Sequence, residues 1–212
     1  MTRFADRTVA GRRLAGALSA FADGPLVLAL PRGGVPVAFE VARALDAELD
    51  VFVVRKLGVP GHEELAMGAI ASGGTVVLND AVIAELDVPR TAIDDVVLHE
   101  GRELARRERA YRGTSAPLDV RTRVVLVVDD GMATGATMRA ALTALRSQAP
   151  ARLIVAVPVA ARETCDELAG LADEIVCPET PTPFLGVGMW YHDFTQTTDD
   201  DVRRLLASAR DR

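Results

Sequence analysis

The sequence predicts an α/β fold, in which a mainly parallel sheet is flanked by helices on both faces. Two observations lead to this prediction. Short apolar runs, which are typical of buried strands, alternate along the chain with segments of helical periodicity. In addition, 49% of the 212 residues are hydrophobic, which is enough for the core of one domain.

The elements follow from this alternation in chain order. Each strand run is short and apolar, and several are bounded by Gly or Pro. The predicted strands are Leu26–Leu30, Val51–Val54, Ala66–Ala71 beside Thr75–Leu78, Val124–Val128, Leu153–Val157 and Ile175–Val176. The predicted helices are an N-terminal one through Leu14, Ala17, Leu18 and Phe21, one through Val37, Val41, Ala44 and Leu45, then Gly135–Arg146 and Asp199–Ala209.

A further helix is predicted at Thr91–Arg112, where acids and arginines are dense and the apolar stripe is thin. Such a charge pattern favours a largely solvated outer face, with an anion-binding role as the alternative. We expect a single domain over residues 1–212. It carries a charged helical insertion at about 80–113 and a small "hood" subdomain at about 178–197.

Composition excludes several classes of protein. The formal net charge is 24 − 30 = −6, so a general nucleic-acid or anionic-membrane binder is not expected. Cys165 and Cys177 lack metal-ligand spacing, which favours reduced thiols and a cytoplasmic protein. No apolar run approaches the roughly 20 residues of a membrane span, and the N-terminal arginines fit an amphipathic helix better than a targeting signal.

The strongest candidate site follows the strand Val124–Val128. Two acids, Asp129 and Asp130, come first and a helix begins shortly afterwards; between them lie Gly131, Met132, Ala133, Thr134, Gly135, Ala136 and Thr137. Ligands collect at the carboxyl ends of parallel strands. A loop of small residues at a helix N-terminus presents amide protons to a phosphate, while the carboxylates accept hydrogen bonds from sugar hydroxyls. The pattern suits a ribose 5-phosphate; the alternative is a capped helix preceded by turn residues.

This segment resembles the 5-phosphoribosyl 1-pyrophosphate (PRPP) signature of the type I phosphoribosyltransferases: an apolar strand, two acids, three residues, then T-G-x-T. The segment Leu30–Pro36 (LPRGGVP) resembles the pyrophosphate loop of that family. The pair Arg55-Lys56 resembles the basic pair that begins its mobile active-site loop. The likeness is greatest to a bacterial branch usually described only as "predicted phosphoribosyltransferase".

The resemblance implies a role for each matching position. Asp129 and Asp130 would hold the ribose hydroxyls, and the loop Gly131–Thr137 would hold the 5′-phosphate. Backbone around Gly33 and Gly34 would approach the pyrophosphate, and Arg32, Arg55 and Lys56 would neutralise it as it leaves. Mg²⁺ would travel with PRPP. The stretch Leu57–Glu64 would be a lid, in which His62, Glu63 and Glu64 are expected to be solvated loop residues. Surface salt bridges are the alternative for the basic residues, and a simple Pro-Gly turn for the glycine loop.

The acceptor, a nitrogen heterocycle, is expected under the hood. Phe184, Val187 and Trp190 are the candidates to contact it, and aromatic rings there can stack on a flat base; the alternative is that they pack the hood onto the sheet. A loose likeness to the hypoxanthine-guanine enzymes would make Asp193 a magnesium ligand. Those enzymes carry an acid where this chain has Ala133, so the loop is more similar to the adenine type.

The resemblance implies a PRPP-dependent transferase that releases pyrophosphate, often dimeric in this family. Two alternatives stay open. One is a PRPP- or nucleotide-sensing regulatory module without turnover, and the other is a partner subunit with a vestigial site. The basic pair and the glycine-bearing lid favour the enzyme, because a sensor needs no lid.

Overall fold

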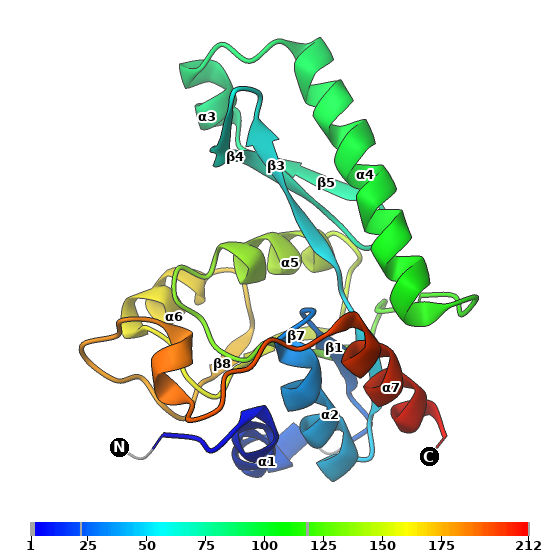
Figure 1. Ribbon diagram of the computed structural model, residues 1–212, viewed down its shortest axis with the longest axis vertical. Coiled ribbons are helices and arrows are strands. Elements are labelled where there is room, and N and C mark those ends of the chain that lie inside the picture. The colour runs from blue at the N-terminus through cyan, green and yellow to red at the C-terminus, as the bar shows by residue number, and fades with distance from the viewer. Residues whose placement is uncertain (1–2, 22, 118, 212) are drawn as a thin grey trace.

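A computed structural model of the chain describes residues 3–21, 23–117 and 119–211. Its central sheet has five parallel strands in the order β2 (Glu48–Val51), β1 (Leu26–Ala29), β6 (Val124–Val128), β7 (Arg152–Ala156) and β8 (Glu174–Val176). Helices lie on both faces of this sheet (Figure 1). The predicted fold class is therefore confirmed.

Alternate residues of each strand face opposite layers, as period-two geometry requires. On one face Val27, Leu126 and their neighbours pack with three helices: α1 (Arg7–Ala17), α2 (Gly34–Ala44) and α7 (Asp199–Arg210). On the other face Leu28 and Val127 pack with α5 (Ala136–Arg146) and α6 (Arg162–Leu168). The strands are buried from both sides, which explains why their sequences are apolar without interruption.

A second unit, which we call the arm, spans residues 54–112. Strands β3 (Val54–Val59), β4 (His62–Ala71) and β5 (Thr75–Leu78) form an antiparallel sheet. They are followed by α3 (Asp80–Glu85) and the long helix α4 (Arg90–Arg112). Figure 1 shows the arm rising from the body on the side of α5. The remaining regular pieces are two 3-10 turns, η1 (Ser19–Phe21) and η2 (Val187–Trp190).

Two expectations about the secondary structure of this region are wrong. The run Val51–Val54 is not one strand: β2 ends at Val51, Phe52 and Val53 are buried between the sheets, and β3 begins at Val54. The expected lid at Leu57–Glu64 is not a loop. It comprises the end of β3, a tight turn in which Gly61 has φ +80°, and the start of β4. Gly and Pro mark the turn of a hairpin here.

Helix α4 is present where the charge pattern predicted it, and its C-terminal end is not solvated. Arg112 and Asp50 form an ion pair with side chains only 5% and 4% exposed, and Arg112 Nε lies 2.9 Å from both carboxylate oxygens. Arg112 Nη2 also donates to Val51 O at 2.5 Å. The arm helix is thereby joined to β2. Among the described residues, no helix is long and apolar enough to cross a membrane.

Candidate active site at the carboxyl edge of the sheet

Two loops meet at the carboxyl ends of β1 and β6, because the register pairs Ala29 with Val128. Leu30 N donates to Val128 O at 2.8 Å, which holds the loops together as they leave the strands. A Cβ at Gly33 would lie 2.1 Å from Asp130 Oδ2, and one at Gly34 would lie 2.7 Å from Val128 O. These glycines are therefore needed for contact between the loops, whatever ligand approaches them.

The cup is the loop Gly131–Thr137 at the start of α5. It encloses a cavity of about 140 Å³ that is lined by Asp129 and by every residue from Gly131 to Met138. Gly135 has φ +66°, a conformation that favours glycine, and it turns the chain into the helix. The first amide protons of α5 have no intrahelical acceptor. The N–H groups of Ala133, Thr134 and Gly135 likewise find none among the described residues. The cavity has the donors that an anion needs.

A second layer supports the cup from α6. The Thr164 hydroxyl donates to Ala133 O. A Cβ at Gly135 would lie 2.6 Å from Thr164 Cγ2. On the other side, Val187 of the hood contacts Gly131, where a Cβ would lie 2.6 Å from Val187 Cγ1. The loop is thus held between α6 and the hood.

The acid pair, Asp129 and Asp130, has two different environments. Asp129 borders the cavity and accepts a hydrogen bond from Asp130 N at 2.8 Å. Burial, and then the neighbouring Asp130 charge, raises the pKa of Asp129 well above its usual value. Burial also raises the pKa of Asp130, but the Arg7 guanidinium opposes that shift.

Arg7 of α1 is a residue that the sequence reasoning missed. Its Nε donates to Asp130 Oδ2 at 2.8 Å, and the two side chains are 11% and 13% exposed. Its Nη1 donates to Thr195 O at 2.8 Å, and its guanidinium lies 4.0 Å from the Phe194 ring centroid. The contact with Asp130 joins residues 123 positions apart, so no local pattern could have indicated it.

Arg32, in the loop after β1, lies near the end of α4. Its Nη1 is 3.7 Å from Asp199 Oδ1, the same oxygen that accepts a hydrogen bond from Tyr111 OH at 2.8 Å. The Gly34 amide donates to Leu30 O at 3.1 Å and is therefore engaged within the loop. The structure thus brings Gly33 and Gly34 to the acid pair, whereas the Arg32 side chain lies beside Asp199 of α7.

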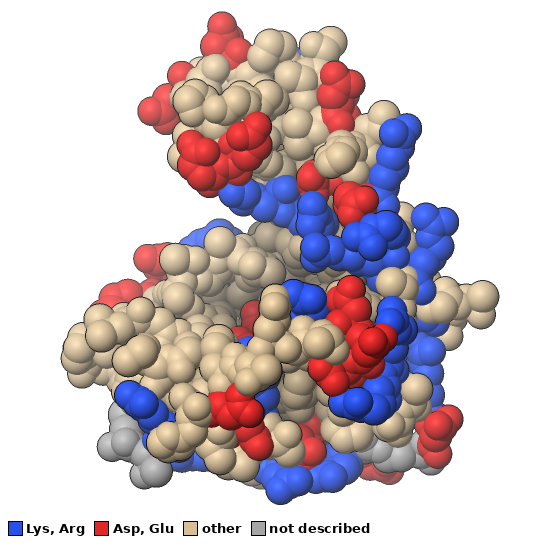
Figure 2. Space-filling model, in the orientation of Figure 1, with Lys and Arg blue, Asp and Glu red and all other residues tan. Residues whose placement is uncertain are grey.

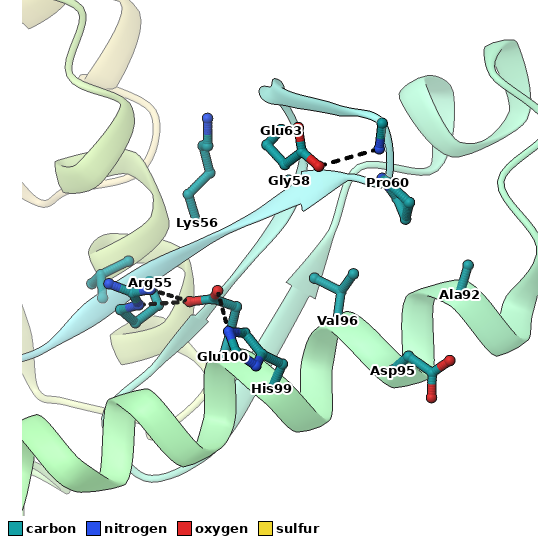
Figure 3. A pocket seen from close by; sticks show the side chains of 12 residues that line it. Arg55, Lys56, Gly58, Pro60, Glu63, Ala92, Asp95, Val96, His99 and Glu100 are labelled. Carbon is teal, nitrogen blue, oxygen red and sulfur yellow. Dashed lines mark hydrogen bonds and ion pairs between the residues drawn. The ribbon is translucent and has the colours of Figure 1, made fainter.

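Arg55 and Lys56 are successive residues of β3, so their side chains point to opposite faces of the arm (Figure 3). Arg55 is paired with Glu100 of α4, with Nε 2.6 Å from Oε2. This pair borders a cavity of about 790 Å³ between the hairpin and α4. Lys56 Nζ donates to Glu64 O at 3.0 Å. His62, Glu63 and Glu64 are exposed, as expected, although they belong to β4.

A second cavity, of about 610 Å³, connects the arm to the cup. Its lining includes Lys56 from β3 and Thr134, Ala136 and Thr137 from the cup, with Arg139 of α5 nearby. Figure 2 shows Lys and Arg side chains at the base of the arm, beside the hollow between the arm and the body. Of the predicted basic pair, Lys56 therefore borders both cavities, whereas Arg55 borders the one beside α4.

The hood residues pack against one another and against Phe4, Ala10 of α1 and Val159. The Phe184 and Trp190 rings are stacked, with centroids 6.5 Å apart and planes 16° apart. Tyr191 OH donates to Asp130 O at 2.6 Å, so the hood is tied to the acid pair. Leu185 is 77% exposed. Trp190 Nε1 is buried and has no hydrogen-bond partner within the part of the chain that the structure describes.

The profile of the phosphoribosyl transferase domain matches residues 61–191, more than half of the chain. This chain belongs to the phosphoribosyl transferase family. A Mycobacterium tuberculosis (strain H37Rv) protein named "Putative phosphoribosyl transferase Rv0571c" is 46% identical over 210 residues, which are 99% of this chain and 47% of that protein. The chain thus spans about half the length of the curated relative.

Solved structures share the fold of this chain. The protein TT1426 from Thermus thermophilus superposes with a TM-score of 0.86 at 42% identity, covering 98% of this chain and 99% of that one. The hypoxanthine phosphoribosyl transferase of Trypanosoma cruzi superposes with a TM-score of 0.50 at 16% identity, covering 94% and 87%. The second likeness shows the fold alone.

Phosphoribosyl transferases generally use Mg²⁺ together with PRPP. Among the described residues no three His, Cys, Asp or Glu side chains converge as a metal site. Mg²⁺ in proteins is usually bound by only one or two carboxylates and takes its other ligands from water and substrate oxygens. Asp193 is exposed, and Thr195 N and Oγ1 donate to its Oδ1 at 2.9 and 2.6 Å. These bonds lower the pKa of Asp193, so it is an ionised candidate ligand with Oδ2 available.

Proposed function

We propose that the protein binds PRPP with Mg²⁺ and transfers the 5-phosphoribosyl group to a nitrogen of a heterocyclic acceptor, with release of pyrophosphate. The observation that carries this proposal is the cup. A carboxylate and several amide protons that have no acceptor among the described residues border one cavity of about 140 Å³ at the carboxyl edge of a parallel sheet.

Each end of the ligand has matching chemistry in this arrangement. The 5′-phosphate would take hydrogen bonds from the loop Gly131–Thr137 and its two threonine hydroxyls. Asp129 and Asp130 would accept hydrogen bonds from the ribose hydroxyls. The pyrophosphate would lie towards Gly33, Gly34 and Arg32, on the side that Lys56 also reaches. Arg55 would reach the pyrophosphate only if its ion pair with Glu100 were broken.

The reaction exchanges one bond at the anomeric carbon. The bond from C1′ to the pyrophosphate oxygen breaks with its electron pair on oxygen, and a bond from C1′ to the acceptor nitrogen forms. The acceptor proton passes to solvent or to the released pyrophosphate. A bound Mg²⁺ supplies charge neutralisation on the departing oxygens, while Arg32 and Lys56 add fixed positive charge where negative charge develops.

The acceptor is proposed to lie between the cup and the hood, with Phe184, Val187 and Trp190 as its nearest contacts. Two facts support this. Val187 already touches the cup at Gly131, and the exposed Leu185 leaves apolar surface beside the stacked rings. Ala133 carries no side-chain hydrogen-bonding group, so recognition of the acceptor would depend on backbone groups and on the hood.

Calorimetry with PRPP and Mg²⁺ tests binding, and a pyrophosphate-release screen over purines, pyrimidines and small nitrogen heterocycles tests turnover. Calorimetry should detect PRPP binding, and the screen should detect pyrophosphate release with at least one acceptor. Binding without release for any acceptor would favour the sensing module, and absence of binding would contradict the proposal.

The double variant Asp129→Asn/Asp130→Asn tests the ribose assignment. It should lose PRPP affinity, because amides hold sugar hydroxyls less well than carboxylates do. Circular dichroism should show the secondary structure retained. Unchanged affinity in a folded double variant would remove the acid pair from the site.

A further inference from the structure

The contacts of Arg7 with the acid pair and the hood have no place in the roles described so far. This guanidinium donates one hydrogen bond to Asp130 Oδ2 and one to Thr195 O, both at 2.8 Å. It also lies 4.0 Å from the Phe194 centroid and 5.9 Å from that of Tyr191. The N-terminal helix thus reaches the acid pair and the hood with one side chain.

The position of Asp130 is fixed from three directions. Arg7 engages Oδ2, and the Gly33 backbone lies so close to this oxygen that only a glycine fits. Tyr191 OH donates to the backbone oxygen of Asp130 at 2.6 Å. No described side chain donates to Oδ1. Oδ2 is therefore bound by Arg7, whereas Oδ1 has no side-chain donor among the described residues.

We propose that Arg7 is a positioning residue for PRPP, one that fixes Asp130 with Oδ2 bound and Oδ1 free to accept a ribose hydroxyl, and that connects the hood to this arrangement. The proposal rests on the proposed function. Arg7 itself would not touch the substrate. Its effect would pass through Asp130 on one side and through the segment that begins at Phe194 on the other.

A second consequence concerns the charge of the pair. Two adjacent carboxylates in a partly buried site repel each other, and one of them tends to keep its proton. Three charged or titratable groups face Asp130: Asp129 of its own loop, Arg7 of α1 and Tyr191 of the hood. Asp193 is farther away, but it interacts electrostatically with Arg7. Arg7 is the only cation in this set, so its removal should raise the pKa of Asp130 further.

The test compares Arg7→Met and Arg7→Lys with Arg13→Met as a matched control. Arg13 lies on the same helix, pairs with Glu179 of the hood, and lies 5.7 Å from the Phe4 centroid. It therefore shares the charge and the anchoring contacts of Arg7 but does not touch the acid pair. Calorimetric Kd values for PRPP with Mg²⁺ are measured between pH 5 and 8, together with melting temperatures.

At pH 7, Arg7→Met should weaken PRPP binding by about tenfold or more, the usual loss when a charged partner is removed from a hydrogen bond. Its affinity should also fall off at a higher pH than that of the wild type, because Asp130 would take up a proton earlier as the pH falls. The PRPP affinity of Arg7→Lys should lie between those of Arg7→Met and the wild type, since lysine keeps the charge but lacks the planar guanidinium that reaches two acceptors. Arg13→Met should match the wild type in both affinity and pH profile.

Equal affinity and equal pH profiles in Arg7→Met and the wild type would overturn the inference. Equal losses in Arg7→Met and Arg13→Met, without a pH shift, would also overturn it, because anchoring of α1 would then explain both. If Arg7→Met does not fold, Arg7→Lys is compared with Arg13→Met instead, by PRPP affinity and its pH profile. A wild-type protein that does not bind PRPP would instead contradict the proposed function itself.

Discussion

At the scale of single residues, two glycines set the distance between the loops of the candidate site. Gly33 and Gly34 allow the loop after β1 to lie against Asp130 and Val128, with no room for a methyl group. Side chains at these positions would push the acid pair away from the loop that carries Arg32. The geometry of the site therefore requires that Gly33 and Gly34 carry no side chain.

Gly33→Ala should lower both stability and PRPP affinity. Its Cβ would meet Asp130 Oδ2 at 2.1 Å, so the carboxylate must move and leave Arg7. We expect a cost of about 1–3 kcal/mol in urea unfolding, as for other overpacked sites. Gly16→Ala is the control: it lies in α1 with nothing within 4 Å of the added methyl, and it should stabilise the protein by about 0.5–1 kcal/mol. A Gly33→Ala protein as stable as the wild type would contradict the contact.

Sequence reasoning at this scale found the residues that form one continuous segment. The acid pair, the small residues after it and the helix start are neighbours in the chain, so their chemistry is visible together. Arg7 and Asp199 were not predicted, because each reaches the site from a distant helix. Their partners, Asp130 and Arg32, were chosen on local pattern alone. The roles of all of these residues remain predictions.

At the scale of elements, apolar runs predicted strands well where a turn residue bounds them. The bounds of β5 and β6 agree with the prediction, and those of β1 and β7 differ by a residue or so. The prediction of one strand at Val51–Val54 was wrong, because the chain leaves the parallel sheet and enters the arm within these four apolar residues. All of them are suited to a strand, and no Gly or Pro marks the change.

The junction of α4 with β2 should be among the most sensitive points of the fold. Arg112→Met would leave Asp50 as a buried charge without its partner. We expect a loss of about 3–5 kcal/mol in urea unfolding. Asp50→Asn combined with Arg112→Met should recover part of that loss, since no lone charge then remains. A single variant within about 0.5 kcal/mol of the wild type would contradict this account.

The contact of α4 with α7 should make stability fall at alkaline pH. Burial, with the hydrogen bond to Asp199, raises the pKa of Tyr111 from 10.0 to about 12. The folded state thus keeps a proton that the unfolded state releases, so the contribution is complete below pH 10 and is lost as the pH rises towards 12. Tyr111→Phe should lose less stability than the wild type between these values in pH-dependent unfolding. If the free energy of unfolding fell in parallel with pH for the wild type and Tyr111→Phe, the stabilising role of the Tyr111 proton would be refuted.

At the scale of the whole molecule, the net charge of the chain does not describe the charge distribution around the cleft. The chain has a net charge of −6, whereas the cavity beside the cup is lined by Lys56 and Arg139 together with Asp80 and Glu167, and Figure 2 shows further basic side chains at the base of the arm. Attraction of an anion would therefore depend on the positions of these few cations and not on the overall charge.

Salt should distinguish the local charges from the overall charge. If the nearby cations dominate, PRPP affinity should fall as NaCl rises from about 0.05 to 0.5 M, over which the Debye length shortens several-fold. If the net charge dominates, salt should instead raise the affinity. Calorimetry at constant pH and Mg²⁺ separates the two. The variant Lys56→Gln should flatten the dependence, whereas Arg90→Gln, on the outer end of α4, should not.

The stacked pair in the hood has a practical consequence, because Trp190 is the only tryptophan of the chain. Every change in indole fluorescence therefore reports on this one place. An indole that is stacked on Phe184, with its nitrogen buried and unpartnered among the described residues, should emit at short wavelength. A heterocycle that settles against it would quench or shift that emission, so candidate acceptors can be ranked by titration without a label and without turnover.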